Sequence, residues 1–342
     1  MTAQTRIGWQ LSLAVWIVVA ATEGRAQDAP ATFFNGRQLT ITVGVGPGGP
    51  VSLYSQLVAR HLGRHIAGAP TVIVQHMPGA GGLLAANTAY NTMPRDGSAL
   101  VSTNNAILME PLLGGKGAQF DAPKFTWIGG THVEHMLCVT WHTSPITTLA
   151  DAMIRPAVIG SYGADGPSAV FAKAANTFAG TKFSVITGYS SGPDALIAMQ
   201  RSEVDGFCAM GWHELKRQAG WLSEKKVNIL FQMGLQKDKE LADVPLLLDH
   251  AKTLLDREVM ELLYSPLAIG RPLYAPPGVP ADRVQVLRSA LERTLRDPRL
   301  LAEAENAGLP IRHVPGESVE KLVGAIYSAP IHLRERALAV SK

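Results

Sequence analysis

Near its amino end the 342-residue chain reads Ile41-Thr42-Val43-Gly44-Val45-Gly46-Pro47-Gly48-Gly49-Pro50. The apolar first part is typical of a buried strand, and the glycines and prolines after it indicate a loop. Beyond the loop, apolar residues recur at helical spacing, at Val51, Tyr54, Leu57, Val58, Leu62 and Ile66. The N–H groups of a first helical turn point outward at the positive end of the helix dipole, so they can hold an anion. We therefore expect a ligand contact at Gly48, Gly49, Pro50, Val51 and Ser52.

The charges around this loop favour an anionic ligand. No Asp or Glu occurs between Asp28 and Asp96, a run of 67 residues in a chain in which 17% of the residues are charged. The same run contains Arg37, Arg60, Arg64, Arg95 and three histidines. A solvated basic face is the alternative explanation. The formal net charge of the whole chain, +3, is too small to indicate binding of nucleic acid.

The first 26 residues resemble a secretory signal peptide. Arg6 precedes a short apolar core at 11–20, and Gly24 and Ala26 are small residues at positions −3 and −1 of a cut before Gln27. The apolar core is far shorter than the ~20 residues of a membrane span. We therefore expect residues 1–26 to be removed and the mature chain to be exported.

Two cysteines, Cys138 and Cys208, both fall in predicted strands. An oxidising compartment is compatible with a disulfide between them. Two buried thiols are the alternative, because the sequence does not give the distance between the two residues.

Strand and helix patterns alternate from residue 39 to about residue 232, which predicts an α/β fold with doubly wound sheets. Some predicted strands are continuous apolar runs, as at 71–74, which is typical of parallel strands covered on both faces. The predicted strands lie near 39–45, 71–75, 98–103, 125–129, 136–141, 157–160, 182–187, 204–209 and 227–232. The predicted helices lie near 51–66, 81–92, 147–154, 167–179, 193–202 and 211–221, with a helical tail near 281–296, 298–307 and 316–327 that we expect to cover the first sheet.

Three further loops resemble the first one. They span 77–82, 161–168 and 188–193, and each follows a predicted strand and opens a predicted helix. Such loops gather at the carboxyl ends of the strands in a doubly wound sheet, where ligands bind. Four helix ends at roughly +0.5 each would offset about two negative charges, as in a dicarboxylate. Ordinary βα turns are the alternative for any one loop. The candidate ligand residues here and at nearby strand ends are Gly79, Ala80, Ser102, Thr103, Asn104, Gly163, Ala164, Asp165, Ser168, Tyr189, Ser190 and Asp205.

Other motifs suggest different chemistry. The glycines at 44–49 match a dinucleotide-binding loop, but no acidic residue follows about 20 residues later to hold a ribose. Gly188-Tyr189-Ser190-Ser191-Gly192 matches the nucleophile elbow of α/β-hydrolases. A secreted serine hydrolase that uses Ser190, with Asp243 or Asp249 and His250 or His313, is therefore the competing interpretation. The histidine pairs His61/His65 and His132/His135 suggest a solvated helix face and an interdomain connection, so we expect neither a metal nor a cofactor.

Several short motifs occur in a fixed order along the chain. They are Pro47-Gly48-Gly49-Pro50-Val51-Ser52, Met77-Pro78-Gly79-Ala80-Gly81-Gly82, Asp96-Gly97, Gly163-Ala164-Asp165-Gly166-Pro167-Ser168, Tyr189-Ser190-Ser191-Gly192-Pro193-Asp194-Ala195-Leu196, Asp243-Val244-Pro245 and Ala275-Pro276-Pro277-Gly278-Val279-Pro280. In this order and over nearly the whole mature chain, the sequence resembles the solute-binding proteins of tripartite tricarboxylate transporters, the Bug or TctC family. It departs from the family where Ser52 replaces a frequent Asp and Met77 replaces an Arg.

The resemblance implies a type II periplasmic binding protein. Its two α/β lobes would be joined by a two-strand hinge, with lobe 1 formed by 27–135 and 266–342 and lobe 2 by 136–265. Ligand would lie in the cleft between them, held by the candidate residues above. The resemblance also implies a monomeric, non-enzymatic periplasmic carrier. It would bind a mono-, di- or tricarboxylate, aromatic ones included, and pass it to membrane transporter subunits.

Overall fold

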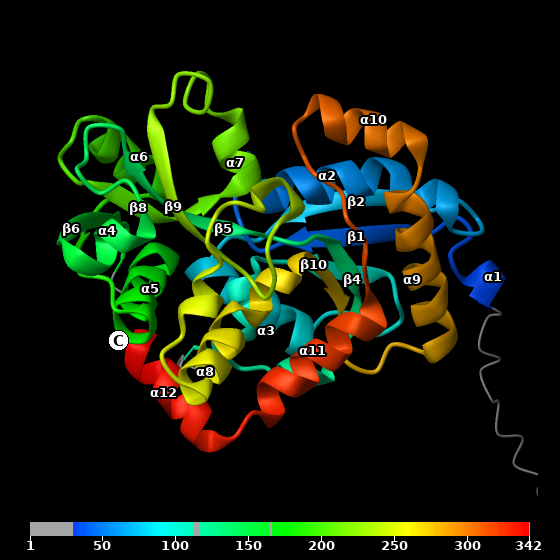
Figure 1. The fold of residues 1–342 in the computed structure, drawn as a ribbon. Coiled ribbons are helices and arrows are strands. Elements are labelled where there is room, and N and C mark those ends of the chain that lie inside the picture. Colours follow the sequence, from blue (N-terminus) through cyan, green and yellow to red (C-terminus); the bar gives the residue numbers. More distant parts are fainter. Residues whose placement is uncertain (1–29, 113–116, 164–165, 342) are drawn as a thin grey trace, which may run out of the picture.

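The computed structural model of the chain describes residues 30–112, 117–163 and 166–341 (Figure 1). The predicted signal peptide at 1–26 and the candidate ligand residues Ala164 and Asp165 lie outside the described residues. Within the described residues, no helix combines the length and the apolar character that crossing a membrane requires.

The first sheet has the strand order β11-β4-β10-β3-β1-β2. Its parallel part consists of β1 (Gln38–Val43), β2 (Thr71–His76) and β3 (Ala99–Ser102), with β1 in the middle. The antiparallel part adds β10 (Gly270–Ala275), β4 (Thr126–His132) and the short β11 (Val314–Pro315). Because β1, β2 and β3 run in the same direction, the loops that follow them meet at one edge of the sheet.

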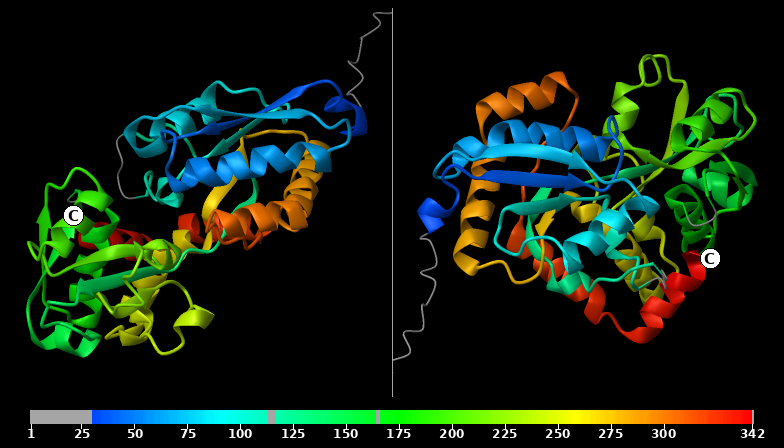
Figure 2. Two further views of the ribbon diagram at one scale, coloured as in Figure 1. Left: turned by 90° about the horizontal axis from the view of Figure 1, so that it is seen from above. Right: turned by 180° about the vertical axis from the view of Figure 1, so that it is seen from behind.

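The second sheet has the strand order β7-β6-β8-β5-β9. Strand β6 (Ala157–Ser161) runs parallel to β7 (Phe183–Thr187) and β8 (Gly206–Gly211), and β5 (Met136–Trp141) runs antiparallel to β8 and β9 (Val227–Met233). With their helices the two mixed sheets form two lobes, as the resemblance implies, and Figure 2 shows the lobes side by side.

Helix α2 shows why the apolar spacing of the sequence correctly predicted a helix. Its N-cap is Gly49, it begins at Pro50, which has no N–H to satisfy, and it ends at Leu62. Its apolar residues Tyr54, Leu57 and Val58 are buried against β1 and β2. The helices and turns with predicted counterparts are α2 (Pro50–Leu62), η1 (Gly63–His65), η2 (Ala80–Gly82), α3 (Leu83–Asn91), α4 (Leu149–Ile154), α5 (Pro167–Ala174), η5 (Ala175–Ala179), α6 (Gly192–Gln200), α7 (Trp212–Arg217), α9 (Ala281–Leu295), α10 (Pro298–Asn306) and α11 (Gly316–Ser328).

Some elements have no predicted counterpart. The largest are α8 (Leu254–Tyr264), which leads into β10, and the C-terminal helix α12 (Ile331–Ser341). The helical tail was expected on the first sheet, and α9 and α11 do pack against β4. In contrast, α12 packs against α5 and α8 of the second lobe and buries Leu333, Ala337 and Val340 there. The smaller elements are α1 (Pro30–Phe33), η3 (Asn105–Leu108), η4 (Ala122–Lys124), η6 (Lys239–Leu241), η7 (Leu247–His250) and η8 (Ser265–Ala268).

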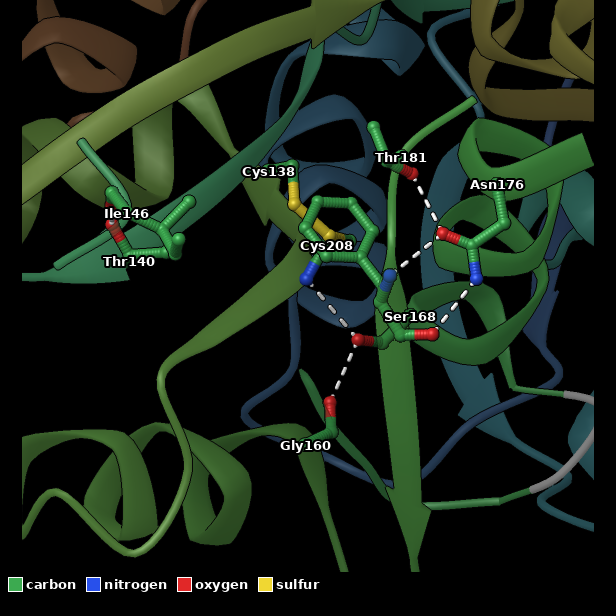
Figure 3. The surroundings of a disulfide bond; sticks show 9 residues. Cys138, Thr140, Ile146, Gly160, Ser168, Asn176, Thr181 and Cys208 are labelled. Carbon is green, nitrogen blue, oxygen red and sulfur yellow. Dashed lines mark hydrogen bonds between the residues drawn. A yellow bond between two sulfur atoms is a disulfide. The ribbon is translucent and has the colours of Figure 1, made fainter. Parts of the chain in front are cut away.

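A disulfide joins Cys138 on β5 to Cys208 on β8. The two strands are antiparallel neighbours, so the cysteines lie opposite each other across one strand pair (Figure 3). Of the two alternatives that the sequence leaves open, the structure has the disulfide. Both cysteines are fully buried in the core of the second lobe.

Candidate functional site

The loops after β1, β2 and β3 are held together by small residues. A Cβ at Gly44 would lie 2.9 Å from the Thr103 side chain and 3.0 Å from the Gly82 backbone, so only glycine fits there. Asn104 donates a hydrogen bond of 2.6 Å to the Gly81 carbonyl. The predicted gathering of the first-lobe loops at one edge of the sheet is therefore present in the structure.

The N-terminus of α2 reaches the space between the lobes at Pro50. The Leu53 N–H donates to the Gly49 carbonyl at 3.0 Å, so the N–H groups of Val51 and Ser52 precede the first hydrogen bond of the helix. The Ser52 hydroxyl is fully buried and contacts Gln56 at 3.0 Å and His76 at 3.4 Å. Ser52 is thus held within the lobe, and its hydroxyl does not face the cavity.

The second lobe presents the starts of α5 and α6. Helix α5 begins at Pro167, and the Ser168 hydroxyl points into the lobe, where it donates to the Gly160 carbonyl at 2.8 Å and accepts from the Cys208 N–H at 3.2 Å (Figure 3). Helix α6 begins at Gly192, and Ser191 caps it by accepting from the Asp194 N–H. Ser168 is therefore a structural residue, and backbone donors remain at both helix starts.

These three helix starts line one cavity of about 460 Å³ between the lobes. Pro50 comes from the first lobe, and Pro167, Gly192 and Pro193 come from the second. Pockets of this size accept small organic ligands. The other lining residues are Met136, Tyr162, Leu196, Phe207, Ala209, Met210, Glu214, Arg217 and Gln218.

A narrow recess of about 30 Å³ continues from Pro50 toward the crossing between the lobes. Its walls include Tyr54, His132, Glu134 and Arg271. The Tyr54 ring stacks on His132 with a centroid distance of 4.8 Å, and its hydroxyl donates to the Pro310 carbonyl at 2.9 Å. The rings of Tyr54, Trp141 and Trp212 are all buried, so none of them is an exposed stacking platform for an aromatic acid.

A buried ion pair lies where the chain crosses between the lobes. Glu134, between β4 and β5, accepts from Arg271 of β10 at 2.6 Å and from Asn105 at 3.1 Å, and its backbone N–H donates to Leu267. Burial alone would raise the pKa of the Glu134 carboxyl, but Arg271 and His132 outweigh this effect and hold the pKa at about 2. Burial lowers the pKa of His132, whose Nε2 lies 3.5 Å from the Glu134 carboxylate.

The sequence reasoning missed the contribution of helix α7 to the site. Glu214 and Arg217 line both the cavity and the recess, and neither forms a hydrogen bond or ion pair with any residue in the described part of the chain. Burial and Lys216 lower the pKa of the neighbouring His213 to about 4. Helix α7 directly follows β8, just as the other candidate loops follow strands, and this position could have suggested a role in the site. This region was missed because no glycine-rich pattern precedes α7.

Other predicted ligand residues lie away from the cavity. Tyr189 packs beside Gly160 in the second lobe, and the exposed Ser190 does not line the cavity. Asp205 precedes β8 at the amino end of that strand, where its carboxylate accepts from Ser144 at 2.9 Å and from the Val158 N–H at 2.7 Å. Several others lie in the described loops but outside the cavity lining, namely Gly48, Gly49, Val51, Gly79, Ala80, Ser102, Thr103, Asn104 and Gly163.

The geometry gives no support to a hydrolase triad around Ser190. Ser190 follows β7, at one edge of the second sheet, whereas Asp249 and His250 lie in η7 beside β9, at the other edge. His313 precedes β11 in the first lobe. Among the described residues, Ser190 forms no hydrogen bond that would activate its hydroxyl.

The histidine pairs have structural partners. His61 contacts Glu303 at 2.8 Å and His65 contacts Asp297 at 3.0 Å, so both rings tie α2 and η1 to the tail helix α10 and its N-cap. Within the described residues, no group of three or more histidine, cysteine, aspartate or glutamate side chains could hold a metal ion.

Comparisons with known proteins place these features in context. A family model, the tripartite tricarboxylate transporter family receptor TctC, matches residues 57–324. Its description is that of a receptor and not of an enzyme. No curated protein sequence matches the chain significantly.

Solved structures share the fold. A TctC solute-binding protein from Polaromonas is 19% identical with a TM-score of 0.70, and the match covers 88% of this chain and 98% of that one. The periplasmic binding protein BugD is 18% identical with a TM-score of 0.61, covering 88% and 97%. An R. palustris protein with adipate is 18% identical with a TM-score of 0.64, covering 89% and 97%.

Proposed function

The chain belongs to the tripartite tricarboxylate transporter receptor (TctC) family, and we propose that it captures a small organic carboxylate between its lobes and delivers it to the membrane subunits of such a transporter. The observation that carries this proposal is the convergence of the starts of α2, α5 and α6 on one cavity. Three helix ends contribute roughly +0.5 each, so the cavity favours an anion without a dedicated arginine.

The ligand carboxylate would accept from the N–H groups of Val51 and Ser52, with the α5 and α6 starts approaching from lobe 2. Closure would be a hinge motion of lobe 1 (27–135 and 266–342, apart from α12, which packs on lobe 2) against lobe 2 (136–265) about residues 133–135 and the segment before β10. The lining residues Pro50, Tyr162 and Pro167 would then move together over the ligand. The adipate that a related R. palustris protein holds is consistent with a carboxylate as ligand.

Export would bring the carrier to its partner. We propose that residues 1–26 direct the chain to the periplasm and are removed before Gln27. Sequencing the amino end of the protein recovered from a periplasmic fraction tests this assignment, and an amino end at residue 1 or 2 would contradict it.

A matched pair of helix-start substitutions tests the binding mode. Pro50→Asp places a negative charge where the carboxylate would bind, and we expect it to weaken carboxylate binding at least tenfold by calorimetric titration. Pro298→Asp makes the same change at the first residue of α10, away from the cavity, and should leave the affinity unchanged. Equal affinity of the Pro50 variant and the unsubstituted protein for every acid bound would rule out the α2 start as the anion site.

A further inference from the structure

We propose that the cavity selects a monocarboxylate with an apolar body, such as a medium-chain aliphatic or aromatic acid, over di- and tricarboxylates. This inference rests on the proposed function, because it concerns the ligand of the same cavity. It departs from the dicarboxylate that four helix ends had suggested, since the start of α3 does not line the cavity.

The second-lobe wall of the cavity is apolar. Tyr162 follows β6 and is 39% exposed, Leu196 projects from α6, and Phe207 and Met210 come from β8. Met136, at the start of β5, completes this wall. Of these side chains only Tyr162 carries a hydrogen-bond donor, and burying a carboxylate against the others without a partner is strongly unfavourable. An apolar ligand body would gain free energy on the same wall.

The charged groups of the site do not favour a second carboxylate either. Arg271 is already neutralised by Glu134 at 2.6 Å. Glu214 and Arg217 are three residues apart on α7, both line the cavity, and their charges offset each other. Three helix ends then leave roughly +1.5, which falls short of the two negative charges of a dicarboxylate.

Close to its own carboxylate, Glu214 opposes the attraction that Arg217 would exert on a ligand carboxylate. Its carboxylate lines the cavity and forms no ion pair with any described residue, and its charge is felt at Tyr162, Tyr54 and His132, where it opposes loss of a proton from each group. A second ligand carboxylate that reached toward α7 would meet this charge in a partly desolvated site, where like charges repel more strongly than in water.

Hexanoate and adipate test the inference, because they share a six-carbon chain and differ in one terminal carboxylate. Calorimetric titration of the mature chain at fixed ionic strength should give an affinity for hexanoate at least tenfold above that for adipate, and 3-phenylpropionate should likewise exceed succinate and citrate. Glu214→Gln should raise the affinity for adipate about fivefold and narrow the hexanoate-to-adipate ratio. Glu258→Gln removes the same charge from the exposed face of α8 and should change neither affinity.

The outcomes separate the two proposals. Adipate, succinate or citrate binding as tightly as the apolar acids, with no gain from Glu214→Gln, would overturn the selectivity and leave carboxylate capture standing. Failure of every acid to bind would overturn carboxylate capture itself.

Discussion

Glu134 is the residue on which the crossing between the lobes depends most. It is fully buried and is held by Arg271, Asn105 and the backbone of Leu267 through its own N–H. Arg271 has a φ of +51°, a conformation that residues with a Cβ rarely adopt. Arg271 therefore holds a strained backbone conformation at the same position where its side chain pairs with a buried carboxylate.

We expect Glu134→Gln to reduce the free energy of unfolding by about 3–5 kcal/mol, because it leaves the buried Arg271 without a counter-ion. Urea denaturation at pH 7 measures the change. Glu240→Gln, which removes an exposed partner of Lys216, should cost less than about 1 kcal/mol. Similar losses from both substitutions would mean that burial does not set the strength of the Glu134 pair.

His213 makes the stability depend on pH in the mildly acidic range. Its pKa in the fold is about 4, below the usual value of about 6.5, so the unfolded chain binds more protons between these values. The contribution of neutral His213 to the free energy of unfolding is therefore fully present above about pH 6.5. It is lost as the pH falls toward 4. Burial lowers the pKa of His132 and His135 as well, which acts in the same direction.

The unsubstituted protein loses stability between pH 7 and pH 5. We expect this loss to be smaller by on the order of 1 kcal/mol in the His213→Gln variant. Thermal unfolding of both proteins at several pH values measures this slope. At pH 8 the substitution should not alter the pH dependence, since the histidine is neutral in both states there. An unchanged slope below pH 6.5 would show that His213 charges freely in the folded protein.

At the scale of elements, glycines determine how closely the loops of the first lobe can approach one another. We expect Gly44→Val to destabilise the protein by about 1–3 kcal/mol, because its Cβ would lie 2.9 Å from the Thr103 side chain. Nothing lies within 4 Å of a Cβ at Gly46, so Gly46→Ala should change stability by less than about 0.5 kcal/mol. Thermal unfolding measures the stability of both variants. Equal shifts of their unfolding midpoints would mean that the loops can move apart to make room for the larger side chain.

The strand pair β5 and β8 carries the disulfide. The cysteines are 70 residues apart in the sequence, so removing the bond with Cys138→Ser and Cys208→Ser should cost roughly 4 kcal/mol through the unfolded chain. Urea denaturation with and without reductant measures this. Reductant should destabilise the natural protein and leave the double variant unchanged, whereas no effect on the natural protein would indicate two thiols.

At the scale of the whole molecule, the C-terminal chain connects the two lobes a third time. Helix α11 packs against β4 in the first lobe, and α12 packs against α5 and α8 in the second, where Arg336 pairs with the buried Asp256. Figure 1 shows α11 and α12 passing in red beneath both lobes. The proposed hinge closure would therefore have to be accommodated at Ala329 and Pro330, between these helices.

We expect Ala337→Asp to detach α12 from the second lobe, because it puts a charge at a fully buried position among apolar side chains. Limited proteolysis should then cut near residue 330 at least tenfold faster. Ala339→Asp makes the same change on the exposed side of α12 and should not alter the rate. Slow cleavage of both variants would mean that α12 tolerates the charge in place.

The sequence alone was enough to predict the α/β alternation, the family and the start of α2 after a glycine-rich loop. These features depend on residues close together in the chain, such as the apolar spacing after Pro50. The tertiary structure alone decided that the hydroxyls of Ser52 and Ser168 point inward and that Glu214 and Arg217 reach the cavity. Each of these depends on the order of strands and on packing between residues far apart in the sequence, which no local pattern records.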